Sequence, residues 1–177
     1  MRLILIFPIT VIISLLYFVQ LMNSTSKLEV GSSVPDFSLL DQNGKMFDLS
    51  EILGKHNLVI YFYPKDGTQG CTKEACTFRD MYQDFTDAGA EVIGISGDNR
   101  ESHQGFSTAH KLPFTLLSDE DKTVRKLFGV PTDFFGLLPG RVTYIVDKKG
   151  IIRYIFKSQT QIEKHVRESL RILKTLN

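Results

Sequence analysis

Short continuous apolar runs alternate along the chain with stretches whose apolar residues recur every three to four positions. The runs Leu58–Tyr63 and Glu91–Gly97 predict buried strands, the second of them in a parallel sheet. Between them, the helical spacing of apolar residues from Phe78 to Phe85 predicts a helix over about residues 71–87. Strand and helix therefore follow each other closely at the centre of the chain.

The same pattern predicts elements on either side of this centre. Phe37–Leu40 and Lys45–Asp48 flank an Asn-Gly pair typical of a tight β-hairpin, and Ser50 is a candidate cap for a short helix ending near Gly54. Further expected elements are helices at 100–111 and 123–128, strands at 114–117, 142–146 and 151–156, and a C-terminal helix with Ile162, Val166, Leu170 and Leu173 on one stripe. This order predicts an α/β fold with a mixed sheet and helices on both faces.

Residues 3–22 form an almost wholly apolar run, and no charge lies between Arg2 and Lys27. Twenty such residues in a helix would rise about 30 Å, enough to cross a bilayer. We therefore expect a signal-anchor or signal peptide in residues 1–26, ahead of one domain in residues 27–177. A buried core helix is the weaker alternative because the run is apolar on every face. Arg2 favours an inside N-terminus, so the domain is expected to be membrane-anchored or exported to a periplasmic, extracytoplasmic or organelle-lumen space.

Composition narrows the function classes. The 177 residues are 42% hydrophobic and 23% charged, with a net charge of +1, which gives no support to nucleic-acid binding. A chain of this length does not need a disulfide for stability, so its two cysteines favour a redox role. No haem or nucleotide motif is present, and we expect no cofactor and no metal. None of the four histidines is spaced from the cysteines as the ligands of a metal site are. These histidines are His56, His103, His110 and His165.

Both cysteines lie where the central strand gives way to the expected helix. Pro64, Gly67 and Gly70 predict a turn after the strand, which puts Cys71 in the first turn of the helix. Unpaired backbone N–H groups and the positive end of the helix dipole gather there, and both stabilise a thiolate.

The string Pro64-x3-Thr68-x2-Cys71 resembles the peroxiredoxin active-site motif. Its continuation, Cys71-Thr72-x-Glu74-Ala75-Cys76-x-Phe78-Arg79-Asp80, is similar to that of the peroxiredoxin Q group, also called bacterioferritin comigratory protein. The resemblance covers about residues 28–177 and resumes at Gly140-Arg141-Val142-Thr143. Gly67 and Gln69 depart from the usual pattern, in which a larger residue and a proline are common, and are expected to loosen the loop.

The resemblance implies a thioredoxin-like fold and roles for particular residues. Cys71 would be the peroxidatic nucleophile that becomes a sulfenic acid. Thr68 would bridge thiolate and peroxide, although from spacing alone it could equally form a Ser/Thr turn or cap the helix. Pro64 would shape the loop and shield the sulfur. Arg141 would lower the thiol pKa and stabilise the departing oxygen, whereas sequence alone would place it on the surface.

Cys76 would be the resolving cysteine that forms a disulfide with Cys71. In an intact helix, positions five apart differ by about 140° and rise about 7.5 Å. That separation exceeds the reach of a disulfide, so we expect the start of the helix to unwind on oxidation. Glu74, between them, either orients an arginine or is a solvated helix acid.

The implied partners are a peroxide, either hydrogen peroxide or an organic hydroperoxide, and thioredoxin or a similar dithiol that reopens the disulfide. We expect a monomer that contacts the membrane through its N-terminal segment. The apolar loop Phe134–Leu138 is expected to form the active-site rim, the docking surface for the reductant, or part of the core.

Two other function classes fit the cysteines less well. A thiol–disulfide oxidoreductase usually carries Cys-x2-Cys, whereas this chain has Cys-x4-Cys. A membrane-tethered, non-enzymatic domain with a structural disulfide would leave Thr68 and Arg141 unexplained.

Overall fold

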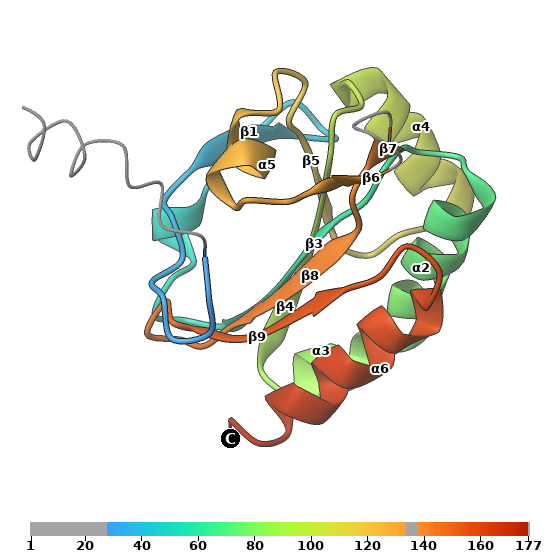
Figure 1. Ribbon diagram of the computed structural model, residues 1–177. Helices are drawn as coiled ribbons and strands as arrows, with labels where there is room; N and C mark the ends of the chain where they lie inside the picture. The colour runs from blue at the N-terminus through green and yellow to red at the C-terminus, as the bar shows by residue number, and fades with distance from the viewer. Residues whose placement is uncertain (1–27, 134–137, 177) are drawn as a thin grey trace, which may run out of the picture.

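The computed structural model describes residues 28–133 and 138–176, and its centre is a mixed seven-stranded sheet in the order β2-β1-β5-β4-β3-β8-β9 (Figure 1). The strands are β1 (Ser38–Asp41), β2 (Met46–Asp48), β3 (Asn57–Phe62), β4 (Ala90–Ser96), β5 (Thr115–Ser118), β8 (Val142–Val146) and β9 (Ile152–Lys157). The pairs β3–β4 and β4–β5 are parallel, and the other neighbours are antiparallel. A separate antiparallel ribbon joins β6 (Thr132–Asp133) to β7 (Leu138–Pro139).

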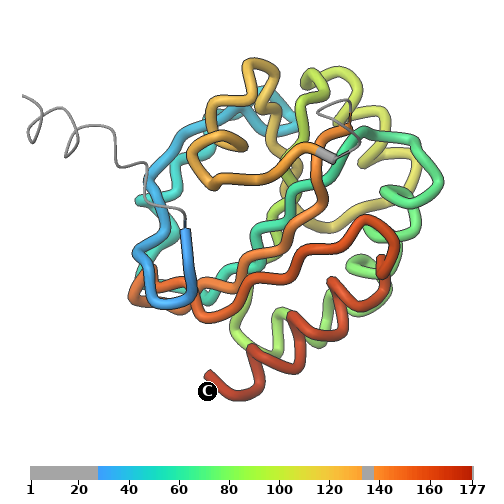
Figure 2. The backbone as a smooth tube through the Cα atoms, viewed as in Figure 1, coloured from blue at the N-terminus to red at the C-terminus, as the bar shows by residue number. Residues whose placement is uncertain are grey.

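Helices cover both faces of the sheet, as the sequence predicts. They are η1 (Leu49–Glu51), α2 (Gln69–Asp80), α3 (Tyr82–Asp87), α4 (Arg100–His110), α5 (Thr123–Leu127) and α6 (Ile162–Leu173). In Figures 1 and 2, α2, α3, α4 and α6 lie on one side of the sheet and α5 lies on the other.

The central strand β3 contributes side chains to the core on both faces of the sheet, because successive side chains of a strand point to opposite faces. Val59, Tyr61 and Tyr63 belong to the buried cluster beneath α2, α3, α4 and α6. Leu58, Ile60 and Phe62 belong to the cluster that includes Phe128, just after α5. Burial on both faces explains why this strand is continuously apolar in the sequence.

Gly94 of β4 makes room for the largest of these side chains. It pairs with Tyr61, and a Cβ atom at Gly94 would lie 2.7 Å from the Tyr61 ring. In the space that Gly94 leaves, the Tyr61 ring stacks on the ring of Phe78 in α2, with centroids 4.7 Å apart. The helix that carries both cysteines is therefore packed directly on the centre of the sheet.

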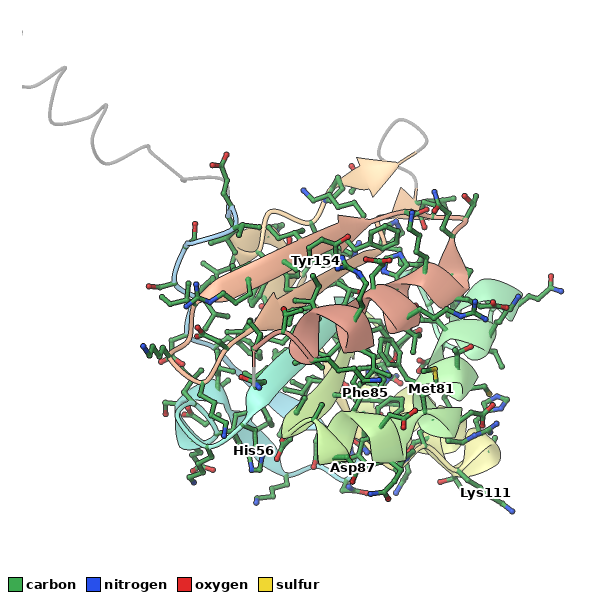
Figure 3. The ribbon with its side chains drawn as sticks, turned by 90° about the horizontal axis from the view of Figure 1, so that it is seen from below. His56, Met81, Phe85, Asp87, Lys111 and Tyr154 are labelled. Atoms are coloured by element: carbon green, nitrogen blue, oxygen red, sulfur yellow. The ribbon has the colours of Figure 1, made fainter. Side chains whose placement is uncertain are left out.

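The single helix predicted over residues 71–87 is two helices, α2 and α3, separated at Met81 (Figure 3). Met81 leaves the helical region, with φ −106° and ψ 11°. The break redirects α3 onto β4 while α2 packs against α6, and both Phe78 and Phe85 remain buried.

Two smaller predictions also need correction. Asp48, rather than Ser50, caps the short helix η1, because its carboxylate accepts from the Ser50 backbone N–H at 2.9 Å. The segment 129–140, predicted as a loop, contains the ribbon β6–β7. The predicted β-hairpin at residues 37–48 is confirmed, and Gly44 in its turn has a φ of +79° that glycine adopts without strain.

None of the helices in residues 28–133 and 138–176 has the length and apolarity needed to span a membrane. The apolar run 3–22 lies outside the described residues, as do Phe134–Leu137 of the predicted rim. The boundary between residues 1–26 and the following domain stays a prediction.

Candidate active site

The pairing of β3 with β8 brings the two halves of the site together. Phe62 is opposite Val142 at the end of this antiparallel pair. The residues just beyond them, Tyr63 and Arg141, therefore lie at the same edge of the sheet. From this edge one chain segment continues through Pro64 into α2, and the other carries Arg141.

Cys71 is the third residue of α2 and is only 1% exposed. The helix begins after Thr68, whose carbonyl accepts from the Thr72 N–H at 2.8 Å. The N–H groups of the first turn have no partner within a helix and carry the positive end of its dipole. The sulfur is thus buried where an anion is favoured.

Arg141 is a buried cation in contact with this sulfur. Its Nη2 lies 3.3 Å from Cys71 Sγ, and its Nη1 donates to Oε2 of the fully buried Glu74, one helical turn further along α2. Burial lowers the pKa of Arg141, but the charges of Glu74 and Cys71 raise it above its ordinary value on balance. Gly70 lies against this guanidinium: a Cβ atom there would lie 3.4 Å from Arg141 Nη2, in van der Waals contact.

Glu74 is the partner of Arg141 and not a solvated helix acid. Burial raises the pKa of Glu74 to about 7, although Arg141 opposes that rise. Its second oxygen, Oε1, lies 3.7 Å from His165 Nδ1. A buried ion pair of Arg141 and Glu74 therefore connects the sulfur to α6, where His165 lies beside it.

His165 lies at the inner end of this ion pair. Its Nε2 lies 2.8 Å from the Ser158 carbonyl and its Nδ1 lies 2.7 Å from the Thr143 hydroxyl. A carbonyl only accepts, so Nε2 carries a proton and the Thr143 hydroxyl can donate to Nδ1 of the neutral ring. Burial, with a smaller contribution from the nearby Arg141 charge, lowers the pKa of His165 to about 4, although the hydrogen bond to the Ser158 carbonyl opposes this shift.

Arg125, which sequence reasoning missed, ties the two halves of the site together. Its Nη2 donates to the Tyr63 carbonyl at 2.7 Å and its Nη1 to the Gly140 carbonyl at 2.9 Å. These carbonyls immediately precede Pro64 and Arg141. Arg125 is 4% exposed, so its charge is held close behind the site.

A second missed group anchors the loop between β3 and α2. The Asp66 carboxylate accepts from Tyr63 at 2.7 Å and from Ser102 at 2.8 Å, and it lies 2.8 Å from Nδ1 of the fully buried His103. The other ring nitrogen of His103 is 3.1 Å from the Leu117 carbonyl. Burial raises the pKa of Asp66, but the hydrogen bonds from His103, Tyr63 and Ser102 lower it on balance.

The remaining predicted residues lie along this loop. Thr68 is exposed and precedes α2, but its side chain makes no cap hydrogen bond and donates instead to the Lys65 carbonyl at 3.1 Å. Pro64 is half-buried and follows the last ladder bond of β3, from the Tyr63 N–H to the Ile95 carbonyl. Gly67 adopts a φ of +70°, so this glycine suits the turn it occupies.

Cys76 lies in a different environment from Cys71, although both are free and both belong to α2. Cys76 is half-buried, and its Sγ lies 3.9 Å from Nδ1 of His110 at the end of α4. In the described residues, no group of three or more metal-ligating side chains gathers. The arrangement supplies a buried thiol, a fixed cation beside it and a second thiol on the same helix.

Comparison with known proteins identifies the family of the chain. The AhpC/TSA family matches residues 30–155. The chain is 56% identical over 150 residues to peroxiredoxin Q, chloroplastic, of Oryza sativa subsp. japonica, covering 85% of this chain and 69% of that protein. Among solved structures, peroxidoxin BcpB from Mycobacterium tuberculosis superimposes with a TM-score of 0.79 at 34% identity, over 85% of this chain and 99% of that one. The bacterioferritin comigratory protein of Xanthomonas campestris gives a TM-score of 0.74 at 31% identity, over 84% and 96%.

The fold and the buried thiol beside a cation define a thiol-dependent peroxidase with a thioredoxin-like fold. The chain belongs to the AhpC/TSA family and, within it, to the peroxiredoxin Q group.

The predicted membrane-anchored or exported location is contradicted by the plant relatives of Oryza sativa and Sedum lineare, which are named as chloroplastic proteins. That prediction rested on the hydropathy of residues 3–22 and on one charge, Arg2. Neither property reports where a folded domain works. The expected contact of the N-terminal segment with a membrane has no support in the described residues.

Proposed function

We propose that Cys71 is the peroxidatic nucleophile. Its thiolate attacks the outer oxygen of a peroxide, the S–O bond forms as the O–O bond breaks, and the departing oxygen takes a proton to leave as water or an alcohol. Cys71 is thereby oxidised to a sulfenic acid and the peroxide is reduced.

The observation that carries this proposal is the contact between Arg141 and Cys71. A guanidinium 3.3 Å from a buried sulfur favours the thiolate over the thiol, and the helix N-terminus acts in the same direction. The Nε of Arg141 is buried and has no hydrogen-bond partner among the described residues. This donor can serve a peroxide oxygen as charge develops on it.

Thr68 and Pro64 complete the proposed site from the loop side. The Thr68 hydroxyl already donates to Lys65, which leaves its oxygen lone pairs free to accept from the peroxide O–H. Pro64 has no N–H and so presents an apolar ring to the loop, which limits access of water to the sulfur.

Cys76 is the proposed resolving residue. It attacks the sulfenic sulfur, a disulfide forms, and hydroxide leaves as water. Both cysteines lie in one continuous helix, where positions five apart are too distant for a disulfide. Closure therefore requires the first turns of α2 to unwind, and a single chain suffices for the cycle, which favours a monomer.

A dithiol reductant of the thioredoxin type then reopens the disulfide by exchange. Hydrogen peroxide and organic hydroperoxides are the proposed substrates. The bacterioferritin comigratory protein of Xanthomonas campestris has alkyl peroxide reduction activity, which supports including organic hydroperoxides here.

The test is peroxide consumption by the full chain with excess thioredoxin and its reductase. Wild type turns over, Cys71→Ser is inactive, and Cys76→Ser reduces one equivalent of peroxide without thioredoxin-dependent turnover. Wild-type activity retained in Cys71→Ser would rule out the assigned nucleophile. Normal thioredoxin-dependent turnover in Cys76→Ser would rule out the assigned resolving residue.

Unwinding is tested separately by amide hydrogen exchange in residues 71–80. Reduced protein should protect these amides as a regular helix does, and the disulfide form should exchange them about 10-fold or more faster. Equal protection in both forms would contradict the proposed rearrangement.

A further inference from the structure

We propose that His110 is a catalytic residue of the resolving step, where it takes the proton from the Cys76 thiol. This inference rests on the proposed function, in which Cys76 closes the disulfide. It assigns a chemical role to a histidine that the family motif does not contain.

The geometry places the imidazole against the reacting sulfur. His110 Nδ1 lies 3.9 Å from Cys76 Sγ, within reach of a hydrogen bond that involves sulfur. His110 is the last residue of α4, and its ring packs edge-on against Phe106 with centroids 5.0 Å apart. Met81 and Lys111, labelled in Figure 3, follow the two helices that meet here.

Arg79 fixes this meeting point of α2 and α4. Its Nη1 donates to the His110 carbonyl at 2.8 Å, and its Nε donates to Asp80 at 2.9 Å. This hydrogen bond fixes the backbone of His110, and with it the position from which the ring extends. The hydrogen bond to Asp80, together with the charge of Cys76, raises the pKa of Arg79 above its ordinary value.

Several titratable and charged groups lie around His110. The titratable and charged groups facing it are Cys76 and Arg79 from α2, with Asp80 bound to Arg79, and Lys111 follows it in the chain.

The step needs such a base because an ordinary thiol is only a few per cent ionised at neutral pH. The Cys76 S–H bond breaks and its proton passes to His110 Nδ1 before α2 unwinds. The Cys76 thiolate then attacks the Cys71 sulfenic sulfur, forming S–S and breaking S–O. The hydroxide that leaves takes up a proton to become water, so Cys76 is oxidised and Cys71 is reduced with no external redox partner.

The test follows a single turnover of the full-length reduced protein with one equivalent of hydrogen peroxide. Dimedone quenching and mass spectrometry give the rate of Cys71 oxidation and the rate of disulfide formation, each between pH 6 and 9. The variant is His110→Gln, which keeps a polar side chain but cannot take a proton. The matched control is His56→Gln, because His56 lies on the surface near Glu91, 3.7 Å away.

At pH 7, His110→Gln should form the disulfide roughly 10- to 30-fold more slowly than wild type. Its Cys71 oxidation should stay within about twofold, because that step uses groups at the other end of α2. The deficit should close toward pH 9, where the thiol ionises without a base. His56→Gln should match wild type throughout.

Disulfide formation in His110→Gln at the wild-type rate at pH 7 would overturn the inference. A deficit of equal size at every pH, or a matching loss of Cys71 oxidation, would overturn it too, because either result means that the residue only supports the helix. Cys76→Ser separates this failure from that of the proposed function: if its sulfenic acid disappears as fast as in wild type, Cys76 is not the resolving residue.

Discussion

The first turn and the middle of α2 hold cysteines in chemically different surroundings. Cys71, in the first turn, is 1% exposed and contacts the buried cation Arg141. Cys76, five residues later, is half-buried and contacts His110 at the rim between two helices. A fixed charge lies against the first sulfur, whereas the second lies beside an imidazole ring.

This difference matches the demands of the two successive steps proposed for Cys71 and Cys76. The peroxidatic sulfur must be an anion before substrate arrives, so its environment is rigid and charged. The resolving sulfur must reach another part of the same helix, so a surface position that unwinds without disturbing the core is favourable. The buried ion pair behind Cys71 has no counterpart at Cys76 in the described residues.

The largest expected effect comes from removing the charged pair at the Cys71 end. In the double variant Arg141→Gln, Glu74→Gln both partners of the buried pair become neutral, which avoids leaving one charge unpaired. Cys71 oxidation by hydrogen peroxide should slow by about 10²- to 10³-fold, measured by competition kinetics. Iodoacetamide labelling of Cys76 should be unchanged, and a drop of less than about threefold in Cys71 oxidation would contradict the role of the cation.

His165 tests the same end of the helix through pH. The pKa of His165 in the folded chain is about 4, below the ordinary 6.5, so the unfolded chain binds a proton through this window and the folded chain does not. The free energy of unfolding is therefore unaffected by this group above pH 6.5. It falls by about 3 kcal/mol as the pH is lowered from 6.5 toward 4. Urea unfolding of His165→Gln should be flatter over this range than that of wild type or of His56→Gln. If the unfolding free energies of His165→Gln and wild type changed with pH in the same way, His165 would not be a buried neutral group.

Arg125→Lys should have a smaller effect, because lysine keeps the charge but cannot donate to two carbonyls in a fixed fork. We expect a loss of about 2 kcal/mol from the unsatisfied carbonyls of Tyr63 and Gly140. Cys71 oxidation should slow several-fold, while Cys76 labelling should not change. Urea unfolding and competition kinetics measure the two effects, and unchanged values in both would show that Arg125 does not support the site.

The smallest effect is expected at Gly70. The Cβ added by Gly70→Ala would lie 3.4 Å from Arg141 Nη2, in van der Waals contact, so the guanidinium keeps its place but loses room to adjust toward a substrate. Cys71 oxidation should slow by about two- to threefold. Gly105→Ala is the matched control, because Gly105 in α4 has nothing within 4 Å of an added Cβ. An equal response of both variants would show that the contact with Arg141 is not limiting.

The sequence predicted the strands, the main helices and the position of Cys71, because hydrophobic periodicity and turn residues act locally. It did not predict the break at Met81, since Phe78 and Phe85 are seven residues apart and fit one continuous helix as well as two. Arg141 was identified by resemblance alone. Its contact with Cys71 depends on the pairing of β3 with β8, which joins segments 70 residues apart.

Other parts of the site gave no sequence signal. Arg125, His103 and His165 are buried polar residues, and a charged or titratable residue is ordinarily assigned to the surface unless its partner is known. Their partners are backbone carbonyls and side chains supplied by distant segments, such as Gly140 for Arg125. Only the folded chain reveals these contacts.

The environments of the two sulfurs assign them different tasks, and sulfenic acid formation reports those tasks directly. The decisive measurement is mass-spectrometric mapping of sulfenic acid in Cys76→Ser and Cys71→Ser after one equivalent of hydrogen peroxide. We predict rapid, near-stoichiometric sulfenic acid at Cys71 in the first variant and oxidation of Cys76 at least about 10³-fold slower in the second. Oxidation of Cys76 as fast as Cys71 would contradict this division of tasks.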